Sequence, residues 1–534
     1  MNFDLPIISS EANPEFADAR SCSHWLEGLP LINVGLSHGR LLGQLEELNC
    51  FAMPPAERMK VLELLREPVL FVQAEHARKF SAKAVPLSVQ ERDIFNNVLA
   101  LWDGLAYGWE HCLQALASQE PSLSASAALV CQRALWSVGQ KLAEHFKTYQ
   151  SIPEQDWRRA HRIYEFAENT GVARESVSHP AGKDQGATSC AEIYAHALLA
   201  QLANPNQHAA RQQLLVSRWT GLWARKVAIL QDPPADGGVA PLSVDLESGA
   251  GASRASKQGQ GVRFLQVDEL EKSIRKRVAR LRNGELPEPL GLGSDVPAAL
   301  AVQMLVMLHE QWCEDKAARQ STRRALARNA ELCSGIAAMH YYVTGKAFRQ
   351  PGEAKELSQR QRNEIATFGR VSTREEDSYV AAQIAALEHW NLCDESVGGF
   401  HIERPEDGGN GRFTQNQLIA VRPSDARTFI VCTVHWLSVS TNGILSMGAR
   451  AVPGVPRGVG IRATGVNAFS DKFIPALCLP AVPALGSPAT LVIPSGWYRT
   501  NRVIDLYTDK ARPVMLSSAL ERGSNFDRCT YEPV

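Results

Sequence analysis

The sequence has no long hydrophobic run and almost no net charge. No apolar stretch approaches the roughly 18–20 residues that a membrane-spanning helix needs, so no membrane span is expected. An early acid, Asp4, and the lack of a basic segment before an apolar core argue against a signal peptide. The formal net charge is −1 over 534 residues. A basic coat for nucleic acid is therefore excluded, no nucleic-acid partner is expected, and any anion site must be a local cluster.

The eleven cysteines and fourteen histidines do not show the spacings of metal sites. There is no CxxC pair, no HExxH and no close His/Cys grouping along the sequence, so we expect neither a structural metal nor a cofactor. Most cysteines lie in apolar surroundings, as Cys131, Cys432 and Cys478 do. This favours buried free thiols in a reducing compartment over a disulfide framework, and the predicted location is the cytoplasm.

The common sequence signatures of enzymes are also missing. The chain has no GxSxG elbow, no P-loop and no GxGxxG before a predicted helix. An enzyme hidden in the N-terminal part is the weakest of the hypotheses, because nothing there pairs a nucleophile with a base. The sequence therefore predicts a protein that is not an enzyme.

The N-terminal part of the chain is predicted to be helical. Its 45% hydrophobic and 21% charged residues are ordinary for a soluble protein of two to four domains. Apolar residues recur at three and four positions over 55–80, and Ser88 with Glu91 forms a capping box before a long amphipathic run. Residues 1–231 are assigned to a helical domain, with part of the mixed segment 1–50 predicted to be unstructured at its start. The stretch "DWRRAHRIYEFAENTGV" resembles a tetratricopeptide hairpin, but the lack of a fixed period favours an irregular bundle over a repeat array.

Two further segments follow the helical domain. Residues 232–261 are rich in Gly, Pro, Ala and Ser, which is typical of a surface loop or linker. Residues 262–350 are predicted to continue the helical part, with two buried helices ending at Gly345.

The pattern changes to short apolar runs of period two after about residue 395. Eight such runs are separated by Gly, Pro, Asn and Asp turns, which indicates a small β-barrel or sandwich. The predicted fold class is therefore α+β multidomain, with a large all-α N-terminal bundle followed by an antiparallel β-barrel. Trp436 lies within one of the strands and is interpreted as a core residue rather than a stacking platform.

Two clusters of polar and small residues lie where the pattern changes. The stretch "GRVSTREED" contains Arg370 and Arg374, and "NLCDESVGGFHIERP" contains the group Asp394, Ser396, Gly398 and Gly399. Twenty residues separate Arg374 from Asp394. No other Asp/Asn-x-Ser occurs in the sequence, whereas RxxxR occurs three more times on patterns interpreted as helical, at Arg158/Arg162, Arg319/Arg323 and Arg324/Arg328.

Together these motifs resemble the two signatures of the PilZ domain, a bacterial receptor module for cyclic di-GMP: RxxxR, then (D/N)xSxxG. The resemblance covers about residues 356–465 and implies a β-barrel there. Residues 466–534 are then either further strands of that barrel or a second small β unit. By the resemblance, Arg370 and Arg374 bind phosphate and guanine, Asp394 and Ser396 hold a guanine, and the site includes Gly398 and Gly399.

The residue types suit such a ligand. The planar fork of arginine pairs bidentately with a phosphate or with guanine O6 and N7. A carboxylate such as that of Asp394 accepts from guanine N1–H and N2–H, and glycines allow close approach of the backbone.

The leading hypothesis is a non-enzymatic cytoplasmic effector that binds cyclic di-GMP and transmits the effect of binding through the helical domain to a protein partner. Three acids, Glu375, Glu376 and Asp377, follow Arg374 and could pair with the arginines. The alternative is therefore a structural or adaptor protein whose degenerate barrel does not bind nucleotide.

Overall fold

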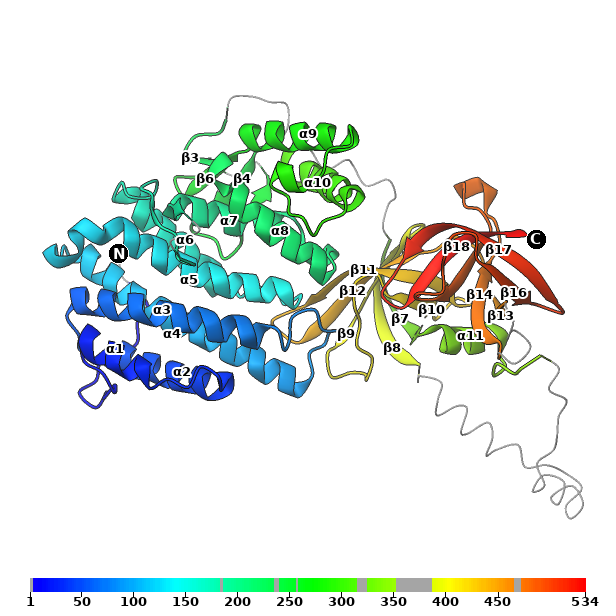
Figure 1. Cartoon of the computed structure of the whole chain (residues 1–534), viewed down its shortest axis with the longest axis horizontal. Helices are drawn as coiled ribbons and strands as arrows, with labels where there is room; N and C mark the ends of the chain where they lie inside the picture. The colour runs from blue at the N-terminus through cyan, green and yellow to red at the C-terminus, as the bar shows by residue number, and fades with distance from the viewer. Residues whose placement is uncertain are drawn as a thin grey trace, which may run out of the picture. The chain divides into compact units, whose positions relative to one another are not determined.

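The computed structural model describes residues 3–182, 186–234, 240–255, 258–314, 324–351, 387–464 and 472–534. The chain divides into two compact units, Met1–Ala318 and Arg319–Val534. In Figure 1 the first unit is built mainly of helices, coloured blue to green, and the second mainly of strands, coloured yellow-green to red. An α+β architecture with helices first and barrels after them confirms the predicted fold class.

The helices of the first unit begin and end much as the sequence patterns predict. Asp18 caps the first helix by accepting from the Ser21 backbone N–H at 2.8 Å, and Ser88 and Glu91 form the predicted capping box. The mixed segment 1–50 contains two helices, the first of which begins at Ala19. The helices are α1 (Ala19–Glu27), α2 (Val34–Cys50), α3 (Pro55–Ala77), α4 (Val89–Ala117), α5 (Ala127–Lys147), α6 (Glu154–Asn169), α7 (Cys190–Leu202), α8 (Ala210–Trp223), α9 (Asp268–Arg282) and α10 (Ala298–Cys313).

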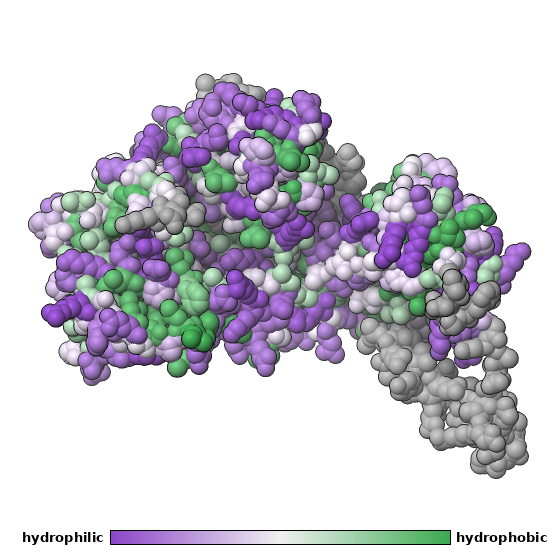
Figure 2. Space-filling view, viewed as in Figure 1, coloured by the Kyte–Doolittle hydropathy of each residue, from purple (hydrophilic) through white to green (hydrophobic). Residues whose placement is uncertain are grey.

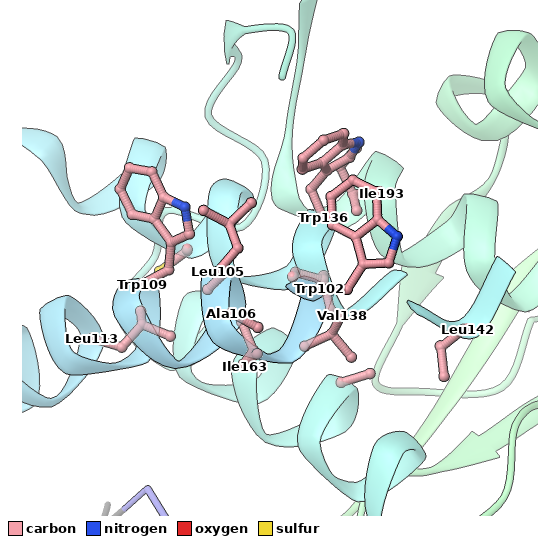
Figure 3. Packing of buried hydrophobic residues seen from close by; sticks show 14 of the residues in the cluster. Trp102, Leu105, Ala106, Trp109, Leu113, Trp136, Val138, Leu142, Ile163 and Ile193 are labelled. Atoms are coloured by element: carbon pink, nitrogen blue, oxygen red, sulfur yellow. The ribbon is translucent and has the colours of Figure 1, made fainter. Parts of the chain in front are cut away.

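A core rich in aromatic residues holds these helices together. Trp102 of α4 and Trp136 of α5 meet edge to face with ring centroids 5.5 Å apart, and aliphatic side chains from α4 to α7 surround them (Figure 3). Figure 2 shows that hydrophobic surface also remains on this unit, over the helices α2 to α4. Among the described residues, no helix is long and apolar enough to cross a membrane.

Several histidines are buried in this core in their neutral form. His145 packs edge to face against Phe95 at 5.5 Å, and burial lowers its pKa to about 4, with the nearby Lys141 acting in the same direction. Burial likewise lowers the pKa of His38 to about 4, and desolvation lowers the pKa of the half-buried His196 to about 4. These side chains therefore link the stability of the helical unit to pH.

The Gly-rich segment 232–261 is not a plain linker, so that prediction is wrong for its described residues. It contributes strands to an antiparallel sheet with the order β3-β6-β4-β5, whose buried side chains Leu242 and Val244 join the helical core. A Cβ on Gly249 would lie 2.5 Å from the Glu154 side chain. Glycine is present there because the backbone packs tightly. The strands of this unit are β1 (Val177–Ser178), β2 (Ala187–Thr188), β3 (Ala228–Leu230), β4 (Leu242–Asp245), β5 (Ser253–Arg254) and β6 (Val262–Gln266).

The second unit contains two closed antiparallel barrels, and the first begins earlier than predicted. Its strand order is β10-β11-β12-β9-β8-β7, and β7 closes it by pairing with both β8 and β10. The prediction of helix over 262–350 is therefore wrong at β7, as is the start of the barrel at residue 356. The strands are β7 (Arg324–Ser334), β8 (Glu388–Ser396), β9 (Gly399–Pro405), β10 (Leu418–Pro423), β11 (Ile430–Val439) and β12 (Ile444–Ala451).

The strands after residue 456 form a separate barrel with the order β13-β14-β15-β18-β17-β16. Of the two alternatives for the C-terminal segment, the structure has the second β unit. The helix α11 (Ile336–Thr344) contacts β13 and β14 of this barrel and β7 of the first. The strands are β13 (Arg457–Ala463), β14 (Ile474–Leu479), β15 (Thr490–Pro494), β16 (Val503–Tyr507), β17 (Ala511–Arg522) and β18 (Phe526–Pro533).

One hydrophobic cluster joins the two barrels. Met339 of α11 is fully buried in it, and Asn525 of the second barrel accepts from the Leu418 backbone N–H of the first at 2.9 Å. The cluster contains Cys333, Ile336, Ala338, Met339, Leu418, Ala420, Phe429, Val431, Val452, Leu477, Leu479, Val492 and Phe526. All eleven cysteines are described and all are free thiols, as predicted.

Candidate ligand-binding site

The predicted motif Asp394-x-Ser396-x-x-Gly399 forms the end of a tight hairpin in the first barrel. Ser396 ends β8 and pairs with Gly399, which begins β9, and Val397 and Gly398 make the turn between them. The Ser396 hydroxyl donates to the Gly399 carbonyl at 3.5 Å, a long hydrogen bond. Asp394 and Ser396 are both half-buried and, two residues apart on a strand, lie on one face of the sheet.

The two glycines of the motif have different roles. Gly399 has φ of +149°, and a Cβ built on it would lie 2.0 Å from the backbone carbonyl oxygen of Ala449 on β12. Gly398 has open space, because its nearest neighbour for a Cβ is the Ser396 hydroxyl at 3.9 Å. Gly399 is therefore needed for the close contact of β9 with β12, and Gly398 is a permissive turn residue.

A β-bulge changes the direction of side chains just before the motif. The register between β8 and β9 shifts between Leu392, which pairs with Ile402, and Asp394, which pairs with His401. Cys393 is the extra residue. Its thiol lies with His401 and Glu403 on the same side as Asp394, whereas Leu392 is buried in the barrel. The bulge thus brings two consecutive polar side chains to the outer face.

A row of cross-strand neighbours extends from Asp394 over four strands. Asp394 on β8 is opposite His401 on β9, His401 is opposite Gly448 on β12, and Gly448 is opposite Trp436 on β11. His401 Nδ1 lies 3.4 Å from Asp394 Oδ2. Directly opposite residues point to the same face of a sheet, so this row forms one surface on the outside of the barrel.

Trp436 belongs to this surface, and the prediction that it is a core residue is wrong. Its side chain is half-buried, and its indole lies over Gly448, where a Cβ would be 1.9 Å from Trp436 Nε1. The His401 ring lies 5.1 Å from the indole, tilted by 53°. The missing side chain at Gly448 leaves room for the indole to lie across the strand. The pairing of this glycine with Trp436 can be recognised in the sequence only once the strand register is known.

Two more residues extend the surface beside this row. Glu403 accepts a hydrogen bond from the Ser446 hydroxyl at 2.8 Å. Arg450, opposite Gly399 on β12, is 57% exposed and pairs with Glu521 of the second barrel at 3.0 Å. Sequence reasoning missed Arg450 because nothing local distinguishes it from other exposed arginines.

The thiol of Cys393 has a shifted pKa within this group. Burial raises its pKa to about 11, and the neighbouring carboxylates of Glu403 and Asp394 act in the same direction. The thiol is therefore protonated at neutral pH and carries no charge. The charged and aromatic groups of this surface are the carboxylates of Asp394 and Glu403, the indole of Trp436 and the guanidinium of Arg450.

The first of the predicted signatures cannot be placed. Arg370 and Arg374 lie outside the described residues, as do the acids that follow them and the pair Arg319/Arg323. Of the remaining RxxxR pairs, Arg158/Arg162 is on the helix α6 as predicted, whereas Arg324/Arg328 is on the strand β7, which corrects its helical interpretation. The structure thus brings together Asp394, Ser396 and Gly399 and adds Trp436 and Arg450 to them.

The fold defines a multidomain protein with a helical unit followed by two antiparallel barrels, the first of which carries this polar and aromatic outer face. Residues 20–235 match the family model described as "Cyclic-di-GMP receptor FimW, N-terminal domain". Residues 459–534 match the "FimW C-terminal beta-barrel domain". The chain is thus similar to these two domains over residues 20–235 and 459–534, and the first barrel lies between the matched parts.

One curated relative is similar to this chain along nearly its whole length. The "Cyclic-di-GMP receptor FimW" of Pseudomonas aeruginosa is 25% identical over 578 aligned positions, covering 98% of this chain and 93% of the relative. The similarity therefore includes the region of the first barrel as well as both matched domains.

Proposed function

We propose that the protein is a non-enzymatic receptor that binds cyclic di-GMP on the outer face of β8, β9, β12 and β11. The observation that carries the proposal is the row from Asp394 to Trp436, since it combines an acceptor for guanine with an aromatic plane on one surface. The relative from Pseudomonas aeruginosa is named as a receptor for this ligand, which supports the same choice.

Each end of the row suits a different part of the ligand. The carboxylate of Asp394 accepts from the N1–H and N2–H of one guanine, and His401, 3.4 Å away, keeps the carboxylate in place. The indole of Trp436 offers its face to a base, and base–aromatic stacking contributes about 1–3 kcal/mol. The strands β8 and β11 lie three inter-strand steps apart, about 14 Å, and the indole shortens this span by lying over Gly448.

The two phosphates of the ligand require cationic partners, and arginines would supply these cations. Arg370 and Arg374, which the PilZ resemblance predicts as ligand contacts, supply charge-assisted hydrogen bonds to phosphate or guanine. Arg450 lies on the same surface, and its side chain is 57% exposed beside a Glu521 that is only 16% exposed, so it can exchange Glu521 for a phosphate. Glu521 would keep Arg528, whose Nη1 lies 3.5 Å from it.

We further propose that binding is relayed to the helical unit and from there to a protein partner. Ordering of a segment by a ligand is a common way of coupling a binding site to a distant surface. Hydrogen exchange of the full chain with and without cyclic di-GMP tests the relay. Protection that changes in α1 to α8 supports it, and changes confined to the barrels contradict it.

Calorimetric titration of the full chain with cyclic di-GMP tests binding. The wild type should bind at least one equivalent of ligand. Arg374→Ala and Asp394→Ala should each weaken binding at least about tenfold, since hydrogen bonds to charged groups contribute about 1.5–3 kcal/mol. Arg158→Ala is the matched control, because Arg158 is an exposed arginine of another RxxxR pair, 51% exposed on α6. Cyclic di-AMP should not bind, because adenine lacks the two donors that Asp394 accepts.

The outcomes separate the hypotheses. No heat from the wild type at high micromolar ligand would refute the receptor and favour an adaptor with a degenerate barrel. Equal binding by wild type and Asp394→Ala would move the guanine site away from this surface.

A further inference from the structure

Three side chains on the outer face of the first barrel offer a thiol, an imidazole and a carboxylate to one point. The ligand atoms of Cys393, His401 and Glu403 all lie within 4.8 Å of one another. The sequence did not indicate this group, because the residues are eight and two positions apart on two strands. The bulge in β8 and the pairing of β8 with β9 bring them together.

The imidazole of His401 is arranged as a metal ligand rather than as a hydrogen-bond donor to Glu403. Its Nε2 lies 3.1 Å from Glu403 Oε1, yet within the described part of the chain this buried nitrogen makes no hydrogen bond. The two atoms are thus close together without pointing at each other. The other nitrogen, Nδ1, lies 3.4 Å from Asp394 Oδ2.

The residues around the group orient its ligands. A carboxylate beside the second nitrogen of a histidine holds the proton on that nitrogen and leaves the first with its lone pair, which is the usual support for a metal-binding histidine. Glu403 is fixed in the same way by the Ser446 hydroxyl, which donates to Oε1 at 2.8 Å. Both oriented ligands therefore have a supporting contact from a second residue.

We propose that Cys393, His401 and Glu403 bind a divalent ion of the zinc type, with Asp394 and Ser446 as positioning residues. A set of one sulfur, one nitrogen and one oxygen suits zinc, which binds these atoms at about 2.0–2.3 Å. Ligand atoms around a tetrahedral ion of that size are about 3.2–3.8 Å apart, so only a small rotation of the half-exposed Cys393 side chain is needed. Water or another ligand takes the fourth position, and binding releases the thiol proton to solvent.

The proposal is independent of the nucleotide. It rests on the protein's own side chains, and it is tested without cyclic di-GMP. Asp394 and His401 belong to both proposed sites, but the two wild-type titrations use different ligands. The absence of metal binding therefore does not bear on nucleotide binding, and the absence of nucleotide binding does not bear on the metal.

The experiment is a titration of the reduced full chain with Co²⁺, followed by displacement with Zn²⁺. The wild type should bind one equivalent with the near-ultraviolet charge-transfer absorbance of a thiolate–cobalt bond. Cys393→Ser should lose this band, whereas Cys50→Ser, which removes another half-buried free thiol, should keep it. His401→Gln should abolish tight binding, and Asp394→Asn should weaken it by about 10–100-fold without changing the spectrum, as expected of a residue that only orients a ligand.

Circular dichroism of each metal-free variant establishes that it is folded before the titration is compared. No thiolate band in the wild type would overturn the proposal, as would an unchanged band in Cys393→Ser. Binding by Asp394→Asn with wild-type affinity would overturn the positioning role and leave the three ligands.

Discussion

Replacing Gly399 by alanine should destabilise the first barrel far more than the same change at its neighbour Gly398. The φ of +149° at Gly399 is a conformation that side chains rarely adopt, and the added methyl would lie 2.0 Å from the carbonyl oxygen of Ala449. No side-chain rotation relieves this contact, since both partners are backbone or Cβ. The strand β9 must therefore move away from β12.

The magnitude follows from two contributions. An unfavourable backbone conformation costs about 1–3 kcal/mol. Separating the end of β9 from β12 loses about two hydrogen bonds of about 1 kcal/mol each. The expected loss is about 3–5 kcal/mol, and a loss of about 3 kcal/mol lowers the melting temperature of a unit of this size by about 6–12 °C.

Differential scanning calorimetry of the full chain measures the effect, and hydrogen exchange of peptides from β9 and β12 assigns it to the barrel. Gly398→Ala is the control, because its Cβ would meet nothing closer than 3.9 Å. Equal melting temperatures for the two variants would refute the assignment of Gly399 to the contact with β12. Reduced binding of cyclic di-GMP by Gly399→Ala would then be a direct effect on the ligand rather than a consequence of strand displacement.

Three further predictions concern the surface and the helical core. Trp436→Ala should weaken cyclic di-GMP binding by about 5–150-fold through loss of stacking, and Trp436→Phe should retain much of it; calorimetry with no difference among the three proteins would exclude stacking. Arg450→Glu should weaken binding more than Arg450→Ala, since it adds a repulsive charge near the phosphates; fluorescence anisotropy with a labelled ligand measures this, and equal affinities would remove Arg450 from the site. The helical unit should lose stability as pH falls from about 6.5 to about 4. The unfolded chain takes up protons that the buried His38 and His145 do not accept in the folded state, with up to about 3 kcal/mol for each. Urea denaturation across this pH range measures the slope, His145→Gln should reduce it, and a flat profile would contradict the buried neutral state.

The sequence patterns were sufficient for the helices and for the barrel-like region. The capping box at Ser88 and the three- and four-residue spacing predict α4 and α3 correctly, because local hydrogen bonding and one buried face determine those elements. The turns between short alternating runs likewise predict the β region. These signals are local, so a single sequence carries them.

The errors have non-local causes. The segment Arg324–Ser334 is rich in helix formers, yet pairing with β8 and β10 makes it a strand, so tertiary contacts override its propensity. The glycines of 232–261 are typical of a surface loop or linker, but Gly249 and Gly251 allow close packing against α6 and α7. Sequence alone does not distinguish these two uses of glycine.

The candidate site was predictable only in part. Asp394 and Ser396 were found from a motif, whereas Trp436, His401 and Arg450 join them through strand register, which a single sequence does not determine. The bulge at Cys393 is similarly invisible in the sequence, and it decides which side chains share the outer face.

The cluster that joins the barrels has a practical consequence for dissecting the protein. Leu477, Leu479, Val492 and Phe526 of the second barrel are buried against residues of the first, and Asn525 satisfies a backbone donor of β10. A fragment cut between the barrels would expose these apolar side chains to water on both halves and leave that donor unpaired. The smallest fragment that preserves the proposed nucleotide surface should therefore include both barrels, and the two should be expressed and engineered together.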